Sequence, residues 1–194
     1  MRSEDLAEGN QIQSEGAKGE RVMRYIRFLL PVVGLLLVCN VAFGQTEAQK
    51  SFDKLKTIAG SWEGTVTTAP PTPEVDGKHV QVTFRVTSMG NAILHEMKIE
   101  GRQDDPITML YLDGDRLMLT HYCDAGNRPR MTGKLSADGK TVEFEFLDVA
   151  GSTEYGHMHH SVFTSIDTNH HSEDWTFMVG DKPVHARLDL QRAK

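Results

Sequence analysis

The chain of 194 residues carries a formal net charge of −6 at pH 7, and 39% of its residues are hydrophobic. A negative net charge without a basic cluster argues against nucleic acid and against an anionic membrane surface as partners. The length allows one domain of about 150 residues with its own core, once a predicted N-terminal segment is set aside.

The first distinctive element is an uncharged apolar stretch at 28–39, which lies between basic and small residues. The basic residues before it are Arg21, Arg24 and Arg27, and the small residues after it are Ala42 and Gly44. This layout predicts a secretory signal peptide over 23–44, cleaved near Gly44, and therefore an exported protein. The alternative is a membrane anchor, but the whole uncharged stretch from 28 to 44, about 17 residues with a proline and an asparagine, is short for a span, which needs roughly 20.

Residues 1–22 are polar and show no periodicity, so we interpret them as a disordered leader or as a wrongly assigned start upstream of Met23. A second alternative for the signal is lipid attachment at Cys39, although Val38 is larger than the residue expected before a lipidated cysteine. The remaining domain, 45–194, keeps only Cys123, which excludes an intramolecular disulfide. We expect no stable membrane span in this mature part.

The mature domain begins with a predicted helix. Residues 46–59 carry Phe52, Leu55 and Ile58 at helical spacing, with lysines between them. This pattern predicts a short amphipathic helix that ends at Gly60 and covers one end of the fold.

About ten segments with alternating apolar and polar residues follow, and turn residues separate them. Their ranges are 61–68, 78–87, 92–100, 107–112, 116–123, 130–135, 141–147, 157–166, 172–179 and 184–190. Asp113-Gly114, Asp138-Gly139 and Gly180-Asp181 supply the positive φ of tight hairpin turns. We therefore predict an all-β fold, an antiparallel up-and-down β-barrel of about ten strands with a short N-terminal helix.

Alternation also predicts which side chains face the interior. It places His95, His121 and Cys123 inside, and it places His159 on the same face as Ser161 in the eighth strand. In the fourth strand it groups Ile107, Met109 and Tyr111. We interpret these interior histidines as hydrogen-bonded polar groups that shape a pocket. The alternative is a metal or haem site built on His95, His121 and His159.

Two further segments concentrate polar residues. Residues 120–131 cross from one strand to the next, and Asn127 and Arg130 at a barrel rim could hold an anionic head group; the alternative is a loop that satisfies its own backbone and pairs its arginines with nearby carboxylates. His170 and His171 are expected in a solvated hairpin turn. Glu173 and Trp175 share an inward face, so the carboxylate needs a partner such as Arg130 or His159.

The segment Gly60-Ser61-Trp62-Glu63-Gly64, with the helix before it, resembles the start of the calycin superfamily, which includes lipocalins and fatty-acid-binding proteins. Together with residues 120–131, it is similar to an uncharacterised group of exported bacterial lipocalin-like proteins. The resemblance implies a ligand-holding barrel and carries no assigned reaction. Nitrobindin-type barrels, which hold haem through a histidine late in the chain, are similar in architecture, but no motif around His157, His159 or His185 matches theirs.

From these patterns we predict an exported barrel that binds a small hydrophobic or amphipathic molecule in its interior. The candidate ligand-binding residues are His95, His121, Cys123, Asn127, Arg130, His159, Glu173 and Trp175. The alternatives are haem or metal binding through the interior histidines, and a structural or interaction module with a solid interior. No catalytic residue is assigned, because no Cys–His pair with a third orienting group is recognisable.

Overall fold

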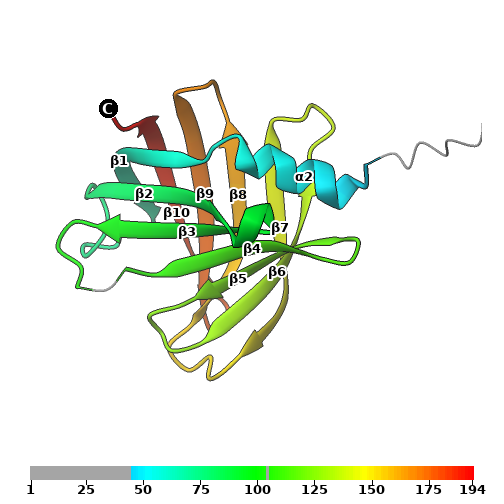
Figure 1. Ribbon diagram of the computed structural model, residues 1–194. Helices are drawn as coiled ribbons and strands as arrows, with labels where there is room; N and C mark the ends of the chain where they lie inside the picture. The colour runs from blue at the N-terminus through cyan, green and yellow to red at the C-terminus, as the bar shows by residue number, and fades with distance from the viewer. Residues whose placement is uncertain (1–44, 104) are drawn as a thin grey trace, which may run out of the picture. The chain divides into compact units, whose positions relative to one another are not determined.

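The structure, a computed structural model, describes residues 45–103 and 105–194 (Figure 1). The predicted leader at 1–22, the signal peptide at 23–44 and the alternative lipid attachment at Cys39 lie outside these residues. The helix is α2 (Glu47–Lys56), and a short 3-10 turn is η1 (Ser88–Gly90). The strands are β1 (Gly60–Ala69), β2 (His79–Thr87), β3 (Ala92–Ile99), β4 (Ile107–Asp113), β5 (Arg116–Tyr122), β6 (Arg128–Leu135), β7 (Thr141–Ala150), β8 (His157–Ser165), β9 (His170–Val179) and β10 (Lys182–Arg192).

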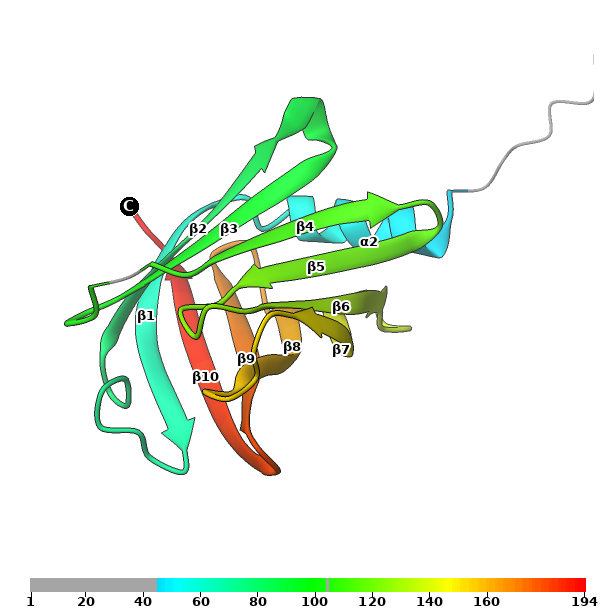
Figure 2. The same ribbon diagram turned by 90° about the horizontal axis from the view of Figure 1, so that it is seen from below.

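The ten strands close into an antiparallel barrel (Figure 2). Each strand pairs with the next along the chain, and β1 also pairs with β10, so that Trp62 lies opposite Val82 on one side and Arg192 on the other. Because the barrel is closed, each of the ten described strands has a neighbour on both sides. The predicted up-and-down barrel with a preceding helix is confirmed.

Helix α2 covers the end of the barrel where β1 begins (Figure 1). Thr46 caps the helix by accepting a hydrogen bond from the backbone N–H of Gln49, and the buried face carries Phe52 and Leu55. The Ser51 hydroxyl accepts a hydrogen bond of 3.0 Å from the backbone N–H of Leu135 on β6. Among the described residues, no helix is long and apolar enough to cross a membrane.

The half of the barrel next to α2 is filled by buried apolar side chains. They include Phe52, Leu55, Trp62, Phe84, Leu110, Leu117, Leu119, Met131, Phe144 and Phe163. The indole N–H of Trp62 donates a hydrogen bond of 2.9 Å to the carbonyl oxygen of Ile58, which ties the end of the helical segment to the core. Burial of this set supplies the main favourable term for folding.

Two inward faces differ from the predicted ones. In β4, Thr108 and Leu110 are buried, whereas Ile107, Met109 and Tyr111 are half-buried. The prediction was wrong because β4 is apolar on both faces, so alternation alone did not distinguish them; pairing of Thr108 with inward-facing His95 and His121 decides the face. The second difference, in β8, concerns His159 and is described with the site.

Gly64 in the Gly60–Gly64 motif allows a close approach between β1 and β10. A Cβ atom on Gly64 would lie 1.8 Å from the carbonyl oxygen of Asp189. We expect Gly64→Ala to lower the free energy of unfolding by about 1–3 kcal/mol, because one strand must move away from the other. Urea denaturation measures the change, with the exposed neighbour Thr65→Ala as the control. Equal stability of the two variants would contradict this role of Gly64.

Candidate ligand-binding cavity

The half of the barrel away from α2 is hollow. Its cavity has a volume of about 850 Å³, within the range of small-molecule sites. The walls come mainly from β1, β3, β9 and β10, and their apolar side chains are Val66, Met97, Ile99, Phe177, Val184 and Leu188. The cavity therefore offers a mostly apolar interior.

The mouth of the cavity is lined by connections that lie at the same end of an up-and-down barrel. They are the β1–β2 connection with Glu74, the β3–β4 connection with Arg102, the β5–β6 connection with Asp124, and the β7–β8 connection with Tyr155. Arg102 and Asp124 form an ion pair across two of these connections. Polar and charged groups thus gather where the cavity meets solvent.

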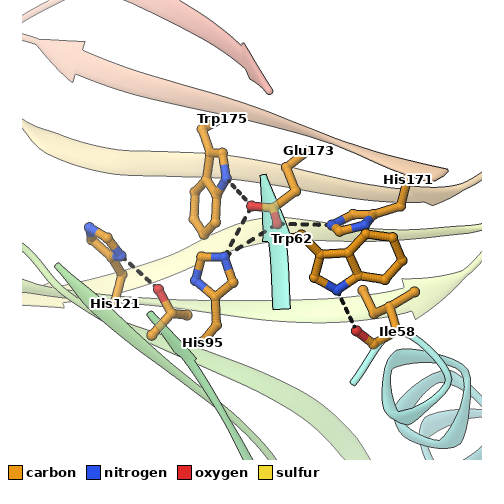
Figure 3. Close-up of polar contacts among 8 residues, drawn as sticks. Ile58, Trp62, His95, His121, His171, Glu173 and Trp175 are labelled. Atoms are coloured by element: carbon orange, nitrogen blue, oxygen red, sulfur yellow. Dashed lines mark hydrogen bonds and ion pairs between the residues drawn. The ribbon is translucent and has the colours of Figure 1, made fainter. Parts of the chain in front are cut away.

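His121 and Trp175 lie at the inner end of the cavity. Their ring centroids are 5.6 Å apart, and both side chains are buried. Nδ1 of His121 lies 2.8 Å from the hydroxyl oxygen of Thr108, which fixes the orientation of the imidazole (Figure 3). Burial, with a smaller contribution from the charge of His95, lowers the pKa of His121 to about 4, so this imidazole is neutral near pH 7.

Behind Trp175 lies a fully buried polar cluster centred on Glu173 (Figure 3). The Trp175 indole N–H donates to Oε2 at 2.9 Å, Nε2 of His95 lies 3.1 Å from the same oxygen, and Nε2 of His171 lies 3.2 Å from Oε1. The cluster separates the hollow half of the barrel from the packed half, because Trp175 lines the cavity while His171 packs edge-on against Trp62 at 4.2 Å.

Glu173 is ionised in this cluster. Burial raises the pKa of its carboxyl group, but the charge of His95 and the hydrogen bonds from His171 and His95 outweigh burial and lower the pKa to about 2. An ionised carboxylate only accepts hydrogen bonds, so Nε2 of both histidines carries a hydrogen. Nδ1 of His95 and Nδ1 of His171 have no hydrogen-bond partner among the described residues.

His171 is the member of the cluster that the sequence reasoning missed. It was expected in a solvated turn, but β9 begins at His170, and His171 is fully buried. The signal was present, because alternation through Trp175 and Glu173 extends back to His171. The suggested partners of Glu173, Arg130 and His159, were wrong, whereas the expectation that a buried Glu173 needs a histidine or arginine partner is met by His95 and His171.

The structure places the other predicted site residues differently. Cys123 lines the cavity, and burial raises the pKa of its thiol to about 11, so the thiol is protonated. Asn127 is buried away from the cavity lining, and its amide donates to the carbonyl oxygens of Ser152 and Gly156 at 2.8 and 2.7 Å. Asn127 thus ties two connections together, whereas the loop alternative expected it to satisfy the backbone of its own loop.

Arg130 and His159 are not brought to the cavity. Arg130 is exposed on the outer face of β6 and pairs with Asp148 on β7, with 2.8 Å between Nε and Oδ1. His159 lies where the register between β8 and β9 shifts, which indicates a β-bulge. This extra residue places Met158 opposite Phe177 in the cavity lining, while His159 stacks on Phe146 with ring centroids 4.5 Å apart. The prediction that His159 shares the inward face of Ser161 was therefore wrong, because the bulge breaks the alternation between them.

The predicted metal set of His95, His121 and His159 does not converge. His95 is bound to Glu173, His121 to Thr108, and His159 lies 3.2 Å from His157. Within the described part of the chain, the group of three side chains with ligand atoms within 4.8 Å of one another is Glu143, Glu145 and His160 on the β7–β8 face. His121 alone remains as an imidazole that lines the cavity.

Comparison with known proteins supports the fold. No family model matches the sequence, and no curated protein gives a significant match. The crystal structure of Rv2717c from M. tuberculosis is similar, with a TM-score of 0.55 and 16% identity over 74% of this chain and 98% of that chain. A protein of unknown function from the DUF3598 family of Nostoc punctiforme gives a TM-score of 0.52 and 10% identity over 72% of this chain and 49% of that chain. At these identities the likeness shows the fold alone.

Proposed function

We propose that this barrel binds a small hydrophobic or amphipathic molecule in the cavity between β1, β3, β9 and β10. The observation that carries the proposal is the hollow half of the barrel, about 850 Å³ in volume, beside a half that is packed solid. Protein interiors are normally close-packed, so a purely structural module would be expected to fill the space around large apolar side chains such as Phe177. The signal peptide predicted at 23–44 adds export to this proposal.

The lining provides both the affinity and the orientation that such a site needs. Each Å² of apolar ligand surface removed from water contributes about 25 cal/mol, and side chains such as Met97, Ile99 and Phe177 supply the apolar contact. His121 places a polar atom at the inner end, beside the ring of Trp175, where it can orient the ligand. Cys123 also lines the cavity, but its protonated thiol supports contact with a ligand rather than nucleophilic attack.

Filling the cavity with a larger side chain tests the proposal. Ala186 lines the cavity and lies opposite Trp175 and Thr68 on the neighbouring strands. We expect Ala186→Trp to weaken binding of an uncharged fluorescent dye about tenfold or more, because the indole occupies the space the dye needs. Fluorescence titration measures the dissociation constant.

His185→Trp is the matched control, because it introduces the same side chain at the neighbouring position, which is exposed. Dye binding that Ala186→Trp leaves unchanged would contradict an interior site. Mass spectrometry of the native protein identifies any molecule that co-purifies with it. A Soret band in the purified protein would instead support the haem alternative, with His121 as the cavity imidazole available to it.

A further inference from the structure

The imidazole of His121 has one nitrogen committed to the protein and one directed elsewhere. Nδ1 lies 2.8 Å from the Thr108 hydroxyl oxygen, and Nε2 is turned away from that hydroxyl (Figure 3). Among the described residues, none forms a hydrogen bond with Nε2. Because His121 also lines the cavity, Nε2 is the polar atom at the inner end that a ligand can reach.

The lining offers little positive charge to a ligand. The titratable side chains among the described lining residues are Glu74, Arg102, His121, Cys123, Asp124 and Tyr155. Arg102 pairs with Asp124, and Glu74 adds a negative charge at the mouth. At the inner end, His121 is uncharged near pH 7, and nearer the mouth the thiol of Cys123, next to Asp124, is protonated.

The polar cluster behind the inner end reinforces this charge pattern. Glu173 is ionised and already accepts hydrogen bonds from His95, His171 and Trp175. Its two histidines are therefore engaged and do not line the cavity. A carboxylate that entered to the depth of His121 would lose its hydration without gaining a cation of its own, because the charge of His95 is already paired with the ionised Glu173.

We propose that the cavity selects ligands whose buried end is an uncharged hydrogen-bonding group, a hydroxyl or a carbonyl, over ligands that end in a carboxylate, and that His121 contacts this group. The inference rests on the proposed ligand-binding function. A neutral imidazole with one nitrogen fixed by Thr108 pairs with a hydroxyl, which both donates and accepts, or with a carbonyl, which accepts from Nε2–H. The apolar chain or ring of the ligand then fills the space toward the mouth.

Three ligands that share one alkyl chain test the selectivity. Dodecanol, methyl dodecanoate and dodecanoate are titrated into the dye-loaded protein at neutral pH. The change in fluorescence as each ligand displaces the dye gives its dissociation constant. We expect the dissociation constants of dodecanol and the methyl ester to be lower than that of dodecanoate by about tenfold or more, because only dodecanoate brings a charge to be buried. Dodecanoate that binds as tightly as dodecanol overturns the inference and leaves interior binding intact. Failure of the dye and of all three ligands to bind overturns the proposed function itself.

Variants of His121 test the contact. His121→Leu removes the hydrogen-bonding nitrogen, whereas His121→Gln keeps a polar group at the same position. We expect dodecanol to lose about fivefold or more in affinity for His121→Leu and to recover part of it for His121→Gln, while dodecane binds both alike. Equal binding of dodecanol to the Leu variant and to the unchanged protein overturns the assigned role of His121. Should a variant fail to fold, the three-ligand comparison on the unchanged protein still decides the selectivity.

Discussion

Replacing Glu173 by glutamine is expected to lower the free energy of unfolding by about 3–5 kcal/mol, because it breaks a fully buried charge cluster. The carboxylate accepts hydrogen bonds from the Trp175 indole and from Nε2 of both His95 and His171. A glutamine amide presents an NH₂ group to donors on one side, so at least one buried donor loses its acceptor. Urea denaturation at neutral pH measures the change.

Glu143→Gln is the control for loss of a glutamate–histidine pair near the surface. Glu143 lies 3.1 Å from Nε2 of His160 and is 40% exposed, so we expect a change below about 1 kcal/mol. A small effect of Glu173→Gln, similar to that of the control, would show that the interior cluster does not stabilise the barrel. The same substitution is expected to perturb the ligand cavity, since Glu173 holds the Trp175 ring at its inner end.

The barrel could be predicted because the sequence patterns that specify its strands, turns and helix are local. The period of two in each strand, the hairpin turns and the helical spacing of Phe52, Leu55 and Ile58 are read within a few residues. In the same way, alternation with Trp175 predicted that Glu173 faces the interior. Arg130 was expected at the barrel rim, but the buried positions of β6 are Pro129 and Met131, so Arg130 faces outward.

The partners within the site were not predictable because they are distant in sequence. Glu173 and His95 are separated by 78 residues and meet only through the order and register of the strands between them. The bulge at His159 adds one residue to β8, and no local signal marks it. His171 was lost for a simpler reason: the turn at 167–170 was extended one residue too far, although β9 begins at His170.

Acidification is expected to destabilise the barrel in two steps, because His121 and Glu173 both have lowered pKa values in the folded state. The folded pKa of His121 is about 4 against an ordinary 6.5, so the unfolded chain binds the extra proton first as the pH falls. Stability is therefore lost between about pH 6.5 and pH 4, by about 3 kcal/mol in total for this group. Glu173, with a folded pKa of about 2 against 4.5, adds a further loss as the pH falls through that lower window.

Urea denaturation at a series of pH values between about 7 and 4 measures the first step and separates His121 from the other histidines. His121→Gln should flatten the upper part of the profile, because glutamine takes up no proton in either state. His79→Gln, whose side chain is 46% exposed near Glu63, is the control for replacing a surface histidine. A profile that is flat above pH 4 in the unchanged protein would mean that His121 is not held neutral. The uncharged inner end of the cavity, and with it the preference for uncharged ligands, would then lose its physical basis.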